Sequence, residues 1–399
     1  MSNKIKLLVL THNYPRHDGD HAGVFIALLL RHLIPHGIQP IVLAPHDPGS
    51  AEHETVEGVE IHRFRYAERD EDETIAYRGN MQQLVLGSVT GIFKFKRFLD
   101  HWRAAAVQLI ERGGIDAVAG HWLVPSGNVM KTLKRKYPQL PMVLSSHGTD
   151  VRLIRKYAGA TYRYFKPFCR RLERWTFVSS FLRDSIRRFD PKLESILEVL
   201  PLPHDETVFY RDDSIERDPD LVVSVTRFTP QKRVDYLIKA FALVSERHPE
   251  ARLLIYGSGA LEAEVRALIE KFGLHDVVEI HPPVDQERLR EIYNRAGMVV
   301  LNSYQEGFGL ALSEAMMCGA PVIGTNSGGI TDIIEHEHRG LLVPLDDASA
   351  LAEAIVRLLT DESLRHGLAE AGHEFATGRY ASKPLAARYA GIIQEAVGK

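Results

Sequence analysis

One pattern recurs along this chain: an apolar run, a glycine-containing turn and then a helix-like segment. Residues 298–319, MVVLNSYQEGFGLALSEAMMCG, show this pattern most clearly. An apolar run bounded by turn residues is typical of a strand that is buried on both faces, and strands that alternate with helices favour a parallel sheet. Because the pattern occurs in both halves of the chain, we expect an α/β protein with two doubly wound parallel sheets.

The two halves are separated by residues 195–220, where the periodicity is lost and proline and charged residues accumulate. Such a change in composition predicts the connection between two domains. A chain of 399 residues is long enough for two or three domains, each with its own apolar core.

Two carboxylates flank the turn within residues 298–319. Glu306 lies in the turn, and Glu314 lies about a turn and a half into the predicted helix. The intervening glycines let a ligand approach the backbone, and the first N–H groups of a helix are free to bind an anion such as a diphosphate. Carboxylates accept hydrogen bonds from sugar hydroxyls. The combination favours a nucleotide sugar as the ligand.

Further candidate residues follow predicted strands. Arg227 and Lys232 lie in the loop that follows Val225 at the end of a predicted strand, and loops after parallel strands emerge at the same edge of the sheet. Two cations there can balance a diphosphate. In the first half, His147 lies in the polar tip that ends the predicted strand PMVLSS. Gly23 precedes a predicted helix over 24–33 and is a candidate phosphate contact.

Candidate metal ligands are present, but their surroundings argue against a metal site. Residues 70–72 and 218–220 match the Asp-x-Asp pattern of metal-dependent sugar transferases, and residues 336–338 are His-Glu-His. All three segments have charged or turn-like surroundings, which indicate solvated surface. Cys169 and Cys318 lack the spacing of zinc ligands. We therefore expect no metal and no cofactor.

Positive charge is concentrated in one block, although the net charge of the chain is only −3. Residues 131–188 contain fifteen Lys or Arg and three Asp or Glu, and residues 152–188 interleave cations with Tyr, Phe and Trp. The block suits an ordinary solvated surface, an anionic membrane or acceptor, or nucleic acid. The first two are favoured, and we expect no nucleic-acid partner.

The composition predicts a cytoplasmic protein. Apolar residues make up 45% and charged residues 25% of the chain, as in ordinary globular proteins. Its apolar runs fall short of the roughly 18–20 residues that span a bilayer, and the first run is too short for a signal-peptide core. The basic block adds the hypothesis of peripheral binding at the inner face of the membrane.

The chain resembles the retaining glycosyltransferases of family 4, which have the GT-B fold. The resemblance rests on EGFGLALSEAMMCGAPVIGTNSGGITDII, with RFTPQKRVDYLIKAF, LLIYGSGALE and HRGLLVPLDDASALAEAIVRLLTD in the expected order. It implies two Rossmann-like domains that face each other across a cleft. The acceptor-side domain would comprise residues 1–205, completed by a C-terminal helix over 379–399, and residues 206–378 would bind the nucleotide sugar.

The resemblance also implies roles for the matched residues. Glu314 would bind the ribose hydroxyls and Glu306 those of the donor sugar. Arg227 and Lys232 would hold the diphosphate, and His147 would lie beside the donor sugar. The remaining residues expected at the donor are Gly23, Asp150, Gly257, Gly259, Phe308, Gly309 and Leu310.

We therefore expect transfer of a sugar from a UDP-, GDP- or ADP-linked donor to an acceptor that is lipid-linked or a glycan. The resemblance favours front-face departure and attack, because no carboxylate is convincingly placed as a nucleophile. The alternatives are a nucleotide-sugar epimerase, a sugar phosphorylase of the same fold, or a non-catalytic binding protein. The intact set of charged residues disfavours the last of these, and no motif for a pyridoxal-bearing lysine supports a cofactor-dependent phosphorylase.

Overall fold

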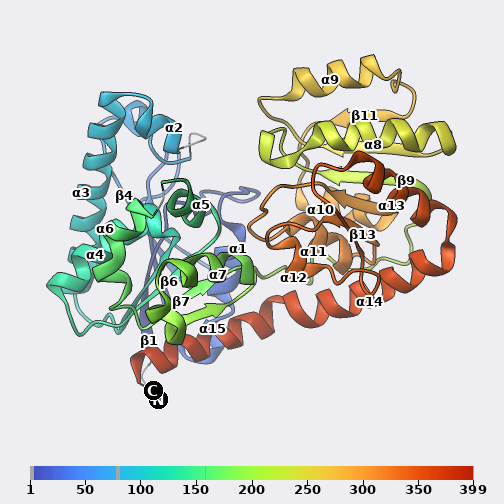
Figure 1. Ribbon diagram of the computed structural model, residues 1–399. Coiled ribbons are helices and arrows are strands. Elements are labelled where there is room, and N and C mark those ends of the chain that lie inside the picture. Colours follow the sequence, from blue (N-terminus) through green and yellow to red (C-terminus); the bar gives the residue numbers. More distant parts are fainter. Residues whose placement is uncertain (1–3, 78–80, 158, 399) are drawn as a thin grey trace. The chain divides into compact units, whose positions relative to one another are not determined.

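The computed structural model describes residues 4–77, 81–157 and 159–398, which form two compact units (Figure 1). Unit 1 comprises Met1–Pro203 and Ser382–Lys399, and unit 2 comprises His204–Ala381. Each unit has its own sheet, largely parallel in unit 1 and parallel in unit 2, and its own buried apolar cluster. The predicted fold class, two doubly wound α/β sheets, is confirmed.

Unit 1 contains an eight-stranded sheet with the order β3-β4-β2-β1-β5-β6-β7-β8. Its neighbouring strands run parallel except β3 and β4, which form an antiparallel hairpin at one edge. The central strands are apolar because helices cover both faces of such a sheet. The strands are β1 (Ile5–Leu10), β2 (Ile38–Pro45), β3 (His53–Val56), β4 (Val59–Phe64), β5 (Ala117–His121), β6 (Met142–Ser146), β7 (Arg174–Phe177) and β8 (Leu197–Val199).

The helices of unit 1 come from both ends of the chain. The last helix, α15 (Ser382–Val397), packs on α1 and buries Leu385, Tyr389 and Ile393 in the core of this unit. The other helices are α1 (Val24–Arg31), α2 (Met81–Leu86), α3 (Val89–Glu111), α4 (Gly127–Lys136), α5 (Thr149–Lys156), α6 (Ala160–Cys169) and α7 (Ser180–Phe189), with short turns η1 (Ile34–His36), η2 (Asp70–Asp72), η3 (Trp122–Ser126) and η4 (Pro191–Ile196).

Unit 2 contains a six-stranded parallel sheet with the order β11-β10-β9-β12-β13-β14. Its first strand begins at Asp218, so residues 218–220, which we expected in a surface loop, belong to a strand. The Asp218 carboxylate accepts a hydrogen bond of 2.6 Å from Arg252 on the neighbouring strand. The strands are β9 (Asp218–Val225), β10 (Arg252–Tyr256), β11 (Val278–His281), β12 (Ala296–Leu301), β13 (Val322–Thr325) and β14 (Leu341–Val343).

Helices α8 and α13 supply much of the unit 2 core, through Leu237, Phe241 and Ile355 among others. The helices are α8 (Val234–Arg247), α9 (Glu262–Lys271), α10 (Gln286–Arg295), α11 (Leu310–Met317), α12 (Ile330–Ile333), α13 (Ala348–Thr360) and α14 (Glu362–Tyr380), with the turn η5 (Pro230–Lys232). Within the described residues, none of the helices combines the length and apolar character that crossing a bilayer requires.

The chain enters and leaves unit 2 at adjacent points. His204 and Ala381, the first and last residues of the unit, form an isolated parallel bridge. The His204 N–H donates to the Tyr380 carbonyl over 2.8 Å. Unit 2 is therefore inserted into the sequence of unit 1, whose final helix begins at Ser382, three residues after the predicted start at 379.

Candidate functional site

The turn that carries Glu306 is held by the turn after β13. The Glu306 carbonyl accepts a hydrogen bond of 2.7 Å from the Gly329 N–H, and Glu306 also forms an isolated bridge with Gly328. Gly328 has φ +67°, and a Cβ atom there would lie 2.5 Å from the Glu306 carbonyl oxygen. Only glycine allows two backbones to approach so closely, so the position of Glu306 is fixed through its main chain.

Glu306 forms an ion pair with Lys232, which ends the turn η5 after β9. β9 and β12 are neighbours in the sheet, and the loops that follow them bring the two side chains together. The side chains are only 16% and 12% exposed, so little water screens the pair. Burial would raise the pKa of Glu306, but the Lys232 ammonium and the hydrogen bonds to the carboxylate, including one from the Gly307 N–H, together lower that pKa below its ordinary value. Without a ligand, the two predicted site residues therefore bind each other.

Arg227, the second predicted cation, lies exposed two residues after the end of β9. Within the part of the chain that the structure describes, its guanidinium makes no hydrogen bond or ion pair. The nearby Gly257 and Gly259 allow the loop after β10 to contact the loop after β9. A Cβ at Gly257 would lie 1.7 Å from the Thr226 carbonyl oxygen, and one at Gly259 would lie 2.5 Å from the Phe228 carbonyl oxygen. These glycines therefore have a packing role that is independent of any ligand.

Glu314 lies on α11, and its surroundings differ from those of Glu306 because it has no cationic partner among the described residues. The residue is partly exposed, but its carboxyl group is enclosed by protein, and the described residues give it one hydrogen bond, from the Tyr293 hydroxyl on α10 at 3.2 Å. Burial raises the pKa of Glu314 to about 8, and the Tyr293 hydrogen bond offsets this only in part. The remaining oxygen lone pairs can bind hydroxyl groups of a ligand.

The start of α11 provides backbone donors beside these glutamates. Gly309 is the N-cap residue, with φ +117°, and no side chain caps this end of the helix. The first N–H groups, beginning at Leu310, can therefore bind an anion. The side chain of Phe308 is buried against Tyr380 and His204 at ring distances of 5.3 and 6.4 Å, so a contact with the donor would involve its main chain.

In unit 1, His147 belongs to a group of three histidines. His12 follows β1, His121 is the last residue of β5, and His147 follows β6. The Nδ1 atom of His121 lies 3.0 Å from the Nε2 atom of His147, and Trp122 packs against His147 and His12. Because β1, β5 and β6 are adjacent, their carboxyl ends bring residues 12, 121 and 147 together. Sequence reasoning found only His147, since nothing local distinguishes the other two among nineteen histidines.

The histidine pair is uncharged at neutral pH. Burial lowers the pKa of His121 to about 3 and that of His12 to about 4, and it holds the pKa of His147 well below 6.5. One neutral imidazole must donate to the other, so the outer nitrogens of the pair, Nε2 of His121 and Nδ1 of His147, are one acceptor and one donor. Neither of these buried nitrogens has a hydrogen-bond partner among the described residues. They are suited to binding hydroxyl groups.

Asp150 and Gly23 shape this region from the backbone side. The Asp150 carboxylate is buried and accepts hydrogen bonds from Leu123 N–H at 2.8 Å and Ser146 Oγ at 2.6 Å, as well as from two further N–H groups in its own turn. It therefore positions the loops of His121 and His147 and is occupied within the fold. At Gly23, which has φ +65°, a Cβ atom would lie 2.3 Å from the Asn13 carbonyl oxygen, so glycine lets α1 begin close to the loop after β1.

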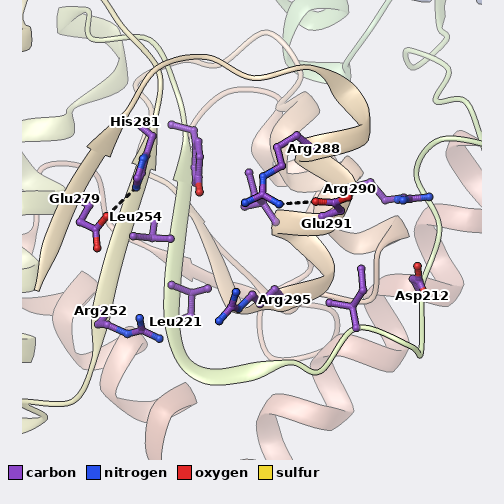
Figure 2. A pocket seen from close by; sticks show the side chains of 13 residues that line it. Asp212, Leu221, Arg252, Leu254, Glu279, His281, Arg288, Arg290, Glu291 and Arg295 are labelled. Carbon is purple, nitrogen blue, oxygen red and sulfur yellow. Dashed lines mark hydrogen bonds and ion pairs between the residues drawn. The ribbon is translucent and has the colours of Figure 1, made fainter.

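A separate groove of about 550 Å³ lies on the face of the unit 2 sheet beside α10 (Figure 2). Among the described residues that line it, none is a predicted site residue. Three of its four arginines are already engaged: Arg252 with Asp218, Arg288 with Glu291 at 2.5 Å, and Arg290 against the Tyr210 ring at 4.8 Å. This groove is therefore distinct from the residues around Glu306.

Both units match models of known protein families. Residues 22–207 match the family model "Glycosyltransferase Family 4", and residues 208–375 match "Glycosyl transferases group 1". An uncharacterized glycosyltransferase of Methanocaldococcus jannaschii is 26% identical over 85% of this chain and 92% of its own length. An exopolysaccharide phosphotransferase of Streptomyces coelicolor is 34% identical over 56% of this chain, but this match spans only 23% of that longer protein.

Solved structures show the same fold. Sucrose-phosphate synthase from Thermosynechococcus elongatus has a TM-score of 0.79 and 22% identity, and the likeness covers 98% of this chain and 99% of that one. Anabaena HepE in complex with UDP-glucose has a TM-score of 0.72 and 16% identity, with coverage of 98% and 100%. At such identities the likeness concerns the fold alone.

The raised pKa of Glu314 predicts a pH-dependent loss of stability. Between its ordinary pKa of 4.5 and the folded value of about 8, the folded protein binds more protons than the unfolded chain, so stability falls as the pH rises through this window. Glu314→Gln keeps a neutral acceptor for Tyr293. Its free energy of unfolding at pH 8, measured in urea, should exceed that of the wild type by roughly 1–4 kcal/mol.

The control is Glu246→Gln, which changes an exposed glutamate on α8 of the same unit. This variant should retain the pH dependence of the wild type. Equal slopes of stability against pH for the wild type and Glu314→Gln would contradict the assignment of a buried, protonated carboxyl group.

Proposed function

Because this chain belongs to the family 4 glycosyltransferases with the GT-B fold, we propose that it transfers a sugar from a nucleotide-diphosphate sugar to an acceptor, with retention at the anomeric carbon. The two family models match successive halves of the chain, which confirms the family that the motifs predicted. HepE, a protein of the same fold, was solved with UDP-glucose and supports a nucleotide sugar as donor.

The observation that carries the proposal is the ion pair between Lys232 and Glu306. Glu306 lies four residues before Leu310, the first residue of α11, whose start has no side-chain cap. A diphosphate is a stronger partner for an ammonium group than one carboxylate, because it carries more negative charge. We propose that, when the donor binds, its diphosphate replaces the Glu306 carboxylate as the ion-pair partner of Lys232. The freed Glu306 carboxylate then accepts hydrogen bonds from the sugar, and Glu314 binds the ribose hydroxyls.

Loss of the diphosphate builds negative charge on the leaving oxygen. Lys232, Arg227 and the α11 amides would stabilise this charge as fixed donors, which is electrostatic catalysis. The leaving phosphate would remain on the face from which the acceptor attacks and would assist in removing the proton of the acceptor hydroxyl. The neutral His121–His147 pair would bind a sugar hydroxyl without adding charge. On this proposal, the chain's own cations take the place of a metal.

The acceptor is proposed to be a glycan or a lipid-linked molecule, met in the cytoplasm or at the inner face of the membrane. Several cations of the basic block, residues 131–188, are already paired, such as Lys134 with Glu173 at 2.9 Å and Arg170 with Asp190 at 2.8 Å. Arg163, Arg171 and Arg188 of the same block are exposed and form no ion pair with the described residues, so they could bind an anionic surface. Co-sedimentation with anionic vesicles at low salt tests the membrane hypothesis, and absence of binding would remove it.

Removal of either charge of the ion pair should abolish most turnover while the fold persists. Lys232→Met and Glu306→Gln are each expected to lower kcat by roughly 100-fold or more, because each removes a preorganised charge from the reacting groups. The assay is product formation from the donor identified below. Lys239→Met and Asp235→Asn are matched controls, because they disrupt an exposed ion pair of 3.0 Å on α8 of the same unit.

The controls should keep turnover within about twofold, since exposed pairs contribute little. Near-wild-type turnover in both Lys232→Met and Glu306→Gln would refute the site. Product analysis with donor alone separates the alternatives: interconversion of the donor sugar without an acceptor would indicate an epimerase.

A thermal-shift screen with UDP-, GDP- and ADP-linked sugars should identify the donor. A ligand that binds only the folded protein adds ~2.7 kcal/mol of stability at 100 times its Kd, so the true donor should raise Tm clearly. Glu314→Ala should reduce that shift. Turnover with the identified donor is expected to survive EDTA. Complete loss of turnover that manganese restores would instead show a metal-dependent reaction.

A further inference from the structure

The β3–β4 hairpin of unit 1 carries three metal-ligating side chains on one face. His53 on β3 lies directly opposite His62 on β4 in the antiparallel register. Glu60 precedes His62 by two residues and therefore points to the same face of the sheet. One ligand atom from each of the three side chains, an imidazole nitrogen or a carboxylate oxygen, lies within 4.8 Å of the others.

The backbone holds these residues in register. Val56 pairs with Val59, so Glu57 and Gly58 form a two-residue turn, and both have positive φ (+48° and +80°). Such a turn matches the twist of a hairpin and fixes its pairing. On its other side β4 pairs with β2 over five residues, so the strand that carries Glu60 and His62 is fixed within the sheet.

The present contacts within the cluster are few. His62 Nε2 lies 2.6 Å from a carboxylate oxygen of Glu60, and the rings of His53 and His62 have centroids 4.5 Å apart. Among the residues described, no lysine or arginine pairs with Glu60. The nearby Arg63 is on the opposite face of β4, where it binds Glu54 at 2.5 Å.

A second group of similar composition shows the contrast. His46, Asp70 and Glu73 also lie within 4.8 Å of one another. Arg65, however, binds Asp70 at 2.5 Å and approaches Glu73 to 3.5 Å, while His46 binds the other oxygen of Glu73. The Arg65 guanidinium already pairs with both carboxylates, so a metal ion would have to compete with it for these ligands.

We propose that His53, Glu60 and His62 bind a divalent transition-metal ion, for which zinc is the best match. Two imidazoles and one carboxylate are a ligand set that zinc favours, and a fourth position remains for water. Magnesium and calcium prefer oxygen ligands throughout, so two imidazoles disfavour them. Binding would replace the hydrogen bond between Glu60 and His62 with metal–ligand bonds.

The position of the site suggests a structural effect. β3 is the edge strand of the sheet, and an edge strand exposes unpaired backbone groups. A metal ion bound by residues of both strands would fasten β3 to β4. The two histidines proposed for sugar binding are His121, which ends β5, and His147, which follows β6. Both strands are separated from β3 by β4, β2 and β1. Metal binding is therefore expected to leave turnover unchanged.

The test uses the full chain after treatment with a chelator. Titration with ZnCl2 by calorimetry should show one saturable site, and CoCl2 should give the visible absorption of nitrogen- and oxygen-bound cobalt. His53→Ala, His62→Ala and Glu60→Gln should each weaken zinc binding at least about tenfold, because each removes one of three ligands. Saturating zinc should raise Tm of the wild type but not of the doubly substituted His53→Ala, His62→Ala protein.

His17→Ala and His36→Ala are matched controls, since both change exposed histidines of unit 1 outside the cluster. They should bind zinc as the wild type does. The proposal is overturned if the wild type shows no saturable binding, or if the double variant, folded by circular dichroism, binds zinc with the same affinity and stoichiometry. Either result would leave the proposed sugar transfer unaffected, because its tests do not involve this hairpin.

Discussion

A parallel strand that is covered on both faces has room for polar chemistry at only one place, the loop after its carboxyl end. Both units obey this constraint. In unit 1 the apolar strands β1, β5 and β6 deliver three histidines to one edge of the sheet. In unit 2, the loops after the neighbouring strands β9 and β12 place Lys232 and Glu306 in contact. Residues far apart in sequence meet because neighbouring parallel strands end on the same side.

The same constraint determines how much the sequence could predict. Glu306, the glycines and Glu314 lie within nine residues, so their arrangement follows from one strand, one turn and one helix. Lys232 could be added because its loop had to emerge at the same edge. His12 and His121 could not be found, since their meeting with His147 depends on the order of three strands. The hydrogen bonds that Asp150 accepts could not be predicted either, because Leu123, which donates one of them, lies 27 residues away in the sequence.

Two glutamates eight positions apart show how strongly local surroundings determine charge. Glu306 has a cation at its carboxylate and remains ionised, whereas Glu314 has a tyrosine hydroxyl and holds its proton up to about pH 8. A buried carboxyl group with a single partner costs stability that a core of apolar side chains would not. Such a cost is typical of positions kept for ligand binding, where the missing partners are those of the ligand.

The insertion of unit 2 within unit 1 has a consequence for biosynthesis. Ribosomes make the chain from its N-terminus, so α15 emerges after all of His204–Ala381. The core of unit 1 lacks Leu385, Tyr389 and Ile393 until then, while unit 2 already has its complete set of strands and helices. Domains generally fold as units during synthesis. The nascent chain can therefore complete the fold of unit 2 first. The core of unit 1 is completed only after α15 has been synthesised, although most of its strands are made earlier.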